Sequence, residues 1–213
     1  MTIFFVTNSD SQTAANLAVA KKIAANTDIK LFGCDALRDK LHNELSGKKR
    51  AIFSMSHGSR LAIIDSDGNE AIVEHDGDAL SGYKVYAWAC MTAQSLGGTL
   101  AQENIHWWGY DAAITAPDDR EKYLDIFSEV ISTAKDNFED GVDHSSIQRI
   151  LDLIKDACDT AQEQLDSIGA IDDENAMSLY SCCHQIWARL CIWLPGAQQP
   201  IKHRNAPSAY IDM

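Results

Sequence analysis

The chain has 213 residues, of which 46% are hydrophobic, and a formal net charge of −13. This length and composition predict one generous folded domain, or a domain with a helical extension, and exclude a disordered chain. No apolar run approaches the roughly 20 residues that span a membrane, so we expect no membrane partner. Residues 118–174 alone carry 17 acidic against 5 basic side chains. Because such an acidic surface repels phosphate backbones, we expect no nucleic-acid partner either.

The amino-terminal residues are apolar without a basic start or a small-residue cleavage site. This pattern is typical of a first strand and not of a secretory signal. Six cysteines without such a signal predict free thiols in a reducing compartment. We therefore expect a cytoplasmic protein.

The first half of the chain alternates between strand and helix patterns. Apolar runs typical of buried strands lie at 2–6, 29–33, 50–56, 83–89 and 105–110. Helix patterns lie between them, at 13–26, 35–46 and 92–103, and Asp10 or Ser11 is placed to cap the first helix. Two further runs enclose the turn sequence SDGN and predict a hairpin. Strands that alternate with helices predict an α/β fold with a mainly parallel sheet, covered on both faces.

The second half changes to helix patterns alone. Apolar side chains recur on one face of three segments, at 123–138, 147–168 and 179–193. We therefore expect an α/β core at 1–117, a helical portion packed on it at 118–195, and an irregular tail at 196–213. Within the third segment, SCCHQIWARLC holds three cysteines beside His184, but their spacing matches no common zinc module. We expect them to pack in the core.

Two chemically active side chains directly follow neighbouring strand patterns. His57 ends the run AIFSMSH, and Cys90 ends KVYAWAC. If those strands are neighbours, their carboxyl ends meet at one edge of the sheet about 4.8 Å apart. Gly58 leaves a backbone N–H open to an oxygen, and the helix expected from Thr92 favours a thiolate at Cys90. This edge of the sheet would then supply a nucleophile in Cys90, a base in His57 and backbone donors for an oxyanion. A simpler interpretation is that His57 is a polar loop residue and Cys90 an inert core cysteine.

A strand ending in SHG, a hairpin, and a strand ending in AC before a glycine-containing helix together resemble the caspase-like cysteine peptidases. The resemblance is strongest to the CHAT group, bacterial relatives of caspases and separase, and covers residues 50–116, more loosely 1–140. It implies a caspase-like three-layer sandwich with a helical carboxyl-terminal portion. It also implies a thiol protease that cleaves a protein substrate and uses no metal or organic cofactor.

Few residues can be carried over from that family. His57 matches the catalytic histidine, as general base or as proton donor to the leaving amine, and Cys90 matches the nucleophile. The backbone amides of Gly58 and Cys90 would form the oxyanion hole. Trp88 stands where caspases carry glutamine and metacaspases aspartate, and it either narrows the substrate pocket or points into the core. Asp111 is either a selector of basic substrate residues or a surface acid.

The pattern also departs from the family in two respects. The separation of His57 and Cys90 is shorter than the roughly 50 residues of caspases, which a tight hairpin would explain. Relatives often carry sensor or repeat domains, and the sequence shows none. The resemblance therefore implies an activating partner protein in trans, in a bacterial antiviral defence or stress system. Two alternatives stay open: a catalytically inactive adaptor subunit of the same fold, and a flavodoxin-like binder of a nucleotide or small molecule.

Overall fold

A six-stranded sheet forms the centre of the computed structural model, which describes residues 1–46, 51–140 and 146–207. The strand order is β2-β1-β3-β6-β7-β8. These strands are β1 (Thr2–Val6), β2 (Ile29–Phe32), β3 (Ala51–Met55), β6 (Lys84–Trp88), β7 (His106–Tyr110) and β8 (Leu190–Trp193). The first five in chain order run parallel, and β8 joins the edge antiparallel to β7. The predicted mainly parallel sheet is therefore confirmed.

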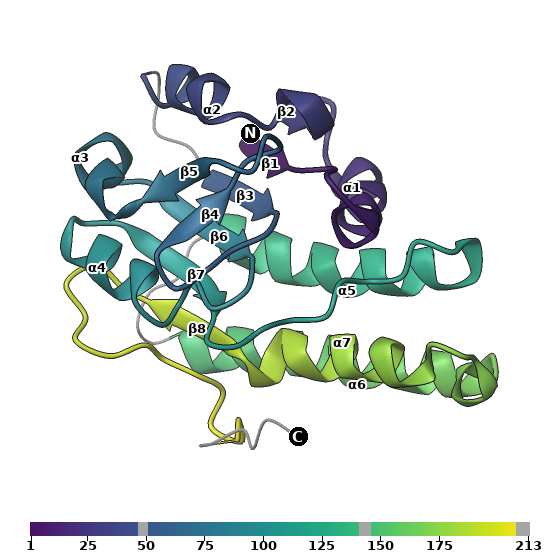
Figure 1. Ribbon diagram of the computed structural model, residues 1–213. Helices are drawn as coiled ribbons and strands as arrows, with labels where there is room; N and C mark the ends of the chain where they lie inside the picture. Colours follow the sequence, from purple (N-terminus) through teal and green to yellow (C-terminus); the bar gives the residue numbers. More distant parts are fainter. Residues whose placement is uncertain (47–50, 141–145, 208–213) are drawn as a thin grey trace.

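Helices cover both faces of the sheet, in three layers (Figure 1). They are α1 (Ser11–Ile23), α2 (Arg38–Leu45), α3 (Gly77–Leu80), α4 (Leu96–Gln102), α5 (Glu121–Asp140), α6 (Ile147–Ser167) and α7 (Ala176–Ala188). One hydrophobic cluster joins the sheet to α1, α5, α6 and α7, and a second joins its other face to α2, α3 and α4. The predicted hairpin is present as β4 (Ala62–Ile64) and β5 (Glu70–Val73), which pair antiparallel. Among the described residues, no helix is long and apolar enough to cross a bilayer.

Alternation along the strands divides the aromatic side chains between the two faces. Trp107 packs in the cluster with α4, whereas Trp108 packs in the cluster with α5. Both are fully buried, because successive side chains of a strand point to opposite faces and both faces are covered. On the α5 face, the Tyr86 and Tyr110 hydroxyls form a hydrogen bond of 2.8 Å inside the core.

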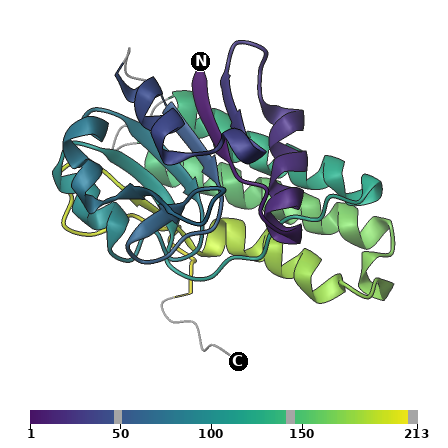
Figure 2. The ribbon, with the colours of Figure 1, turned by 45° about the horizontal axis from the view of Figure 1, so that its top comes forward.

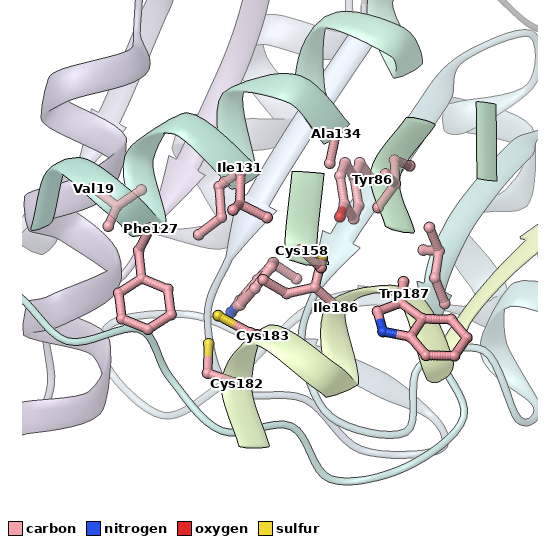
Figure 3. Packing of buried hydrophobic residues seen from close by; sticks show 14 of the residues in the cluster. Val19, Tyr86, Phe127, Ile131, Ala134, Cys158, Cys182, Cys183, Ile186 and Trp187 are labelled. Carbon is pink, nitrogen blue, oxygen red and sulfur yellow. The ribbon is translucent and has the colours of Figure 1, made fainter. Parts of the chain in front are cut away.

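The three carboxyl-terminal helices pack against one another, with α1 beside α5 (Figure 2). The Arg120 guanidinium connects two parts of this layer, because it binds both Asp118 and Asp173. Cys158, Cys182 and Cys183 are buried between the helices (Figure 3). Burial raises the pKa of Cys183 to about 12, so this thiol stays protonated at neutral pH. The cysteines of the SCCHQIWARLC segment thus pack in the core, as predicted.

The structure corrects two predicted helices. The helix expected over 179–193 ends at Ala188, and Leu190–Trp193 form β8. All four β8 residues are buried, because the strand pairs with β7 and is covered on both faces. The helix expected from Thr92 begins only at Leu96, because residues 91–95 form a turn, with Met91 in the left-handed region at a φ of 60°. Cys90 is consequently followed by a turn, and the expected stabilisation of its thiolate by a helix N-terminus is absent.

Candidate active site

The carboxyl ends of β3 and β6 lie side by side and bring His57 and Cys90 together. The two strands are parallel, with Met55 opposite Trp88, and each active side chain lies two residues beyond that pair. The Ser56 N–H donates to the Trp88 carbonyl at 3.2 Å and extends the pairing past the strand ends. His57 and Cys90 line one small pocket together with Trp88. The sequence prediction that these two residues share one edge is confirmed.

Gly58 allows the segment after β3 to pack closely against the segment after β6. A Cβ atom at this position would lie 2.7 Å from the Ala89 Cβ and 3.0 Å from the Cys90 carbonyl oxygen. Real Cβ atoms do not approach that closely, so only glycine fits without displacing the His57 loop. In the part of the chain that the structure describes, neither the Gly58 nor the Cys90 backbone N–H donates a hydrogen bond. Both amides predicted for the oxyanion hole therefore lack a hydrogen-bond partner within the described residues, although Gly58 does not line the small pocket.

Asp10 adds a carboxylate to this edge of the sheet. It follows β1, the neighbour of β3 on the side away from β6, and its Oδ2 lies 2.5 Å from the His57 Nε2. Its Oδ1 accepts the Thr13 N–H at 2.9 Å and caps α1. That backbone hydrogen bond, with help from His57, lowers the pKa of Asp10 to about 2. The carboxylate is thus ionised at neutral pH and can accept a hydrogen bond from the protonated Nε2 of the imidazole.

The sequence predicted Asp10 only as a helix cap and missed its contact with His57. The signal was the same one that identified His57 and Cys90, because Asp10 also follows an apolar strand. Three carboxyl ends of parallel strands therefore contribute one acid, one base and one thiol to a single edge. In nucleophilic enzymes an acid in that position fixes the tautomer and orientation of the base.

The Cys90 thiol is half-buried beside the segment that follows β7. Its sulfur accepts the Ile114 N–H at 3.4 Å and donates to the Ile114 carbonyl at 3.8 Å. The next residue, Met91, has a φ of 60°, a conformation that costs about 1 kcal/mol or more for a residue other than glycine. Strained backbone of this kind gathers at functional sites. Among the described residues, no hydrogen bond joins the thiol directly to the imidazole.

The pocket beside the thiol is narrow, with a cavity volume of about 20 Å³. That is room for about one water molecule. Helix α1 closes one side with Thr13 and Asn16. Trp88 lies at the base and is only 2% exposed, with its ring 5.5 Å from that of Tyr110. Trp88 therefore packs in the core, and it also lines the small pocket.

A larger open cleft continues from this pocket. Its volume is about 520 Å³, and it shares Gln12 and Ala116 with the small pocket. The walls come from the start of α1, the irregular segment 115–120 and the start of α7. The cleft adjoins the pocket of Cys90 through these two shared residues, but its own lining includes neither Cys90 nor His57.

The structure does not bring Asp111 into the pocket. Its carboxylate binds the Lys202 ammonium and lies 3.4 Å from the Arg189 Nε. These two cations of the same chain already compensate its charge. Asp111 also lines neither the small pocket nor the cleft.

Within the described ranges, no three histidine, cysteine or acidic side chains are grouped as metal ligands. No protein-family model matches the chain. Neither the curated proteins nor the solved structures contain a significant match. The function must therefore be inferred from the residues and their geometry.

Proposed function

We propose that the chain is a caspase-like cysteine endopeptidase of the CHAT type, with Cys90 as nucleophile, His57 as base and Asp10 as the residue that orients His57. The observation that carries the proposal is the meeting of these three side chains at the carboxyl ends of three adjacent parallel strands. Helix caps alone would explain Asp10, and core packing alone would explain Cys90. Neither explains why both lie beside the same histidine.

In the proposed mechanism Asp10 orients His57, His57 activates Cys90, and Cys90 attacks the substrate. His57 Nδ1 takes the thiol proton while the Asp10 carboxylate stabilises the imidazolium through Nε2. The Cys90 sulfur attacks the scissile carbonyl carbon, and the Gly58 and Cys90 amides stabilise the resulting oxyanion. His57 then gives its proton to the leaving amine, the C–N bond breaks, and a thioester remains on Cys90. Water, deprotonated by His57, hydrolyses the thioester and restores the thiol.

The surroundings of the three side chains suit a polypeptide substrate. The open cleft adjoins the pocket of Cys90 through Gln12 and Ala116, and its volume of about 520 Å³ has space for a short peptide segment. Its wall includes residues 115–119, which have no regular secondary structure. The absence of a direct thiol–imidazole hydrogen bond fits this mechanism, because the two groups can act on a peptide bond that lies between them.

The experiment that tests this function is cleavage of a proteome-derived peptide library, with new amino termini identified by mass spectrometry. The wild-type protein should produce a recurring cleavage motif, and Cys90→Ala and His57→Ala should abolish it. Cys34→Ala is the matched control, because Cys34 is an exposed thiol that follows β2 and lines neither the small pocket nor the cleft, and it should cleave as the wild type does. Cleavage that persists in folded Cys90→Ala, or none by the wild type, would overturn the proposal.

A further inference from the structure

Asn16 is a buried polar residue whose side chain lacks a hydrogen-bond partner. It lies in the middle of α1, is only 4% exposed, and lines the small pocket together with His57 and Cys90. Within the part of the chain that the structure describes, no group donates to its side-chain oxygen. Buried amides are otherwise almost always hydrogen-bonded, because an unmet acceptor loses its hydration without compensation. An apolar residue of the same size would serve the fold better at this position.

The other buried polar side chains around the pocket are already engaged, whereas Gln12, which also lines the pocket, is exposed to solvent. The Thr13 hydroxyl accepts the Asp10 N–H within the cap of α1, and the Ser56 hydroxyl donates to the His57 carbonyl. Both oxygens of Asp10 are occupied as well, one by Thr13 and one by His57. Asn16 alone among these retains a free hydrogen-bonding group, and it does so next to the nucleophile.

We propose that Asn16 is a substrate-binding residue, whose side-chain oxygen accepts the peptide N–H of the substrate residue that carries the scissile carbonyl. This inference rests on the proposed peptidase function. The missing partner of an oxygen is a donor, and an uncharged carboxamide suits a neutral peptide N–H, whereas a cation would call for a carboxylate. The terminal torsion of asparagine is broad, so the carboxamide can turn its oxygen into the pocket. The pocket has room for about one water molecule, which the N–H would displace.

The test compares three reagents on the full chain, each followed by the rate at which Cys90 gains mass. The first is an acetyl-trialanine acyloxymethyl ketone, and the second is the same ketone methylated on its last peptide nitrogen. The third is iodoacetamide, which reports thiol reactivity without a bound peptide. Asn16→Leu removes the acceptor at similar volume. Asn137→Leu is the matched control, because that asparagine bonds the Thr133 carbonyl within α5, in a different helix.

In the wild type and in Asn137→Leu, methylation should slow the ketone about tenfold, the effect of one lost hydrogen bond. Asn16→Leu should slow the unmethylated ketone by about the same factor and abolish the effect of methylation. Its iodoacetamide rate should be unchanged, and its melting temperature equal or higher.

Three results would overturn the inference. One is an equal effect of methylation in the wild type and Asn16→Leu. Another is a parallel fall of both labelling rates and the melting temperature, which would show a structural role. The third is a wild-type Cys90 that reacts with iodoacetamide but not with the ketone. Failure of the proposed function itself has a different signature, in which wild-type Cys90 reacts with iodoacetamide no faster than Cys34, and the inference then falls with it.

Discussion

The substitution Asp10→Asn separates the two roles of one carboxylate. Its Oδ1 caps α1 through the Thr13 N–H, and its Oδ2 holds His57. Asparagine caps a helix as well as aspartate does, so the free energy of unfolding should fall only by the contribution of the exposed Asp10–His57 ion pair, about 1 kcal/mol or less. The amide, however, donates to Nε2 and moves the ring proton to Nδ1. The imidazole then cannot take the thiol proton, and kcat should fall about 10²- to 10⁴-fold.

The assay pairs urea unfolding with cleavage of a peptide from the library. Asp10→Ala is the matched variant, because it removes both roles and should also lose about 1 kcal/mol of stability. The pKa of Asp10 lies below its ordinary value, so its stabilising contribution is complete above about pH 4 and is lost as the pH falls towards 2. That loss should be absent in Asp10→Ala. Wild-type kcat in Asp10→Asn would refute the assignment of Asp10 as the residue that orients His57.

Two further predictions follow from the glycine contact and from a buried histidine. Gly58→Ala should cost about 1–3 kcal/mol of unfolding free energy, because the new Cβ meets Ala89 and the Cys90 carbonyl; a variant as stable and as active as the wild type in parallel urea and cleavage assays would contradict the contact. His106 accepts the Trp108 indole N–H, and burial lowers its pKa to about 4. Its neutral form is favoured in the folded state, so stability should fall as the pH drops from about 6.5 to 4, by an amount on the order of 2 kcal/mol. His106→Gln should flatten that part of the urea-derived stability profile, and an unchanged slope would show that another group causes it.

Strand positions could be predicted because the sheet is covered on both faces. The run ending at Cys90 is almost continuously apolar, and the run ending at His57 is apolar apart from Ser54 and Ser56, as is typical of strands buried on both sides. Since parallel strands share one carboxyl edge, their last residues could be placed together without knowing the loops. The same rule, applied to β1, would have placed Asp10 there too. It was assigned only to the helix cap because the order of β1 next to β3 depends on contacts remote in sequence.

Other features could not be predicted from local patterns. The β8 residues continue the apolar stripe of α7, and a short, fully buried strand has the same composition as a buried helical turn. Only the pairing with β7 decides between them. The start of α4 at Leu96 follows a turn over residues 91–95, and no local residue pattern predicts that turn. Asn16 resembles any polar helix residue until its burial beside Cys90 is known.

The reactivity of Cys90 relative to Cys34 is the most direct measure of the proposed catalytic site. Cys34 is exposed, whereas Cys90 is partly buried and the remaining four cysteines are buried. Accessibility alone would make Cys34 react first with iodoacetamide at neutral pH. If His57 activates the thiol, Cys90 should react faster than Cys34, and His57→Ala should slow Cys90 alone. Faster labelling of Cys34, with a Cys90 rate indifferent to His57→Ala, would contradict a peptidase built on these residues.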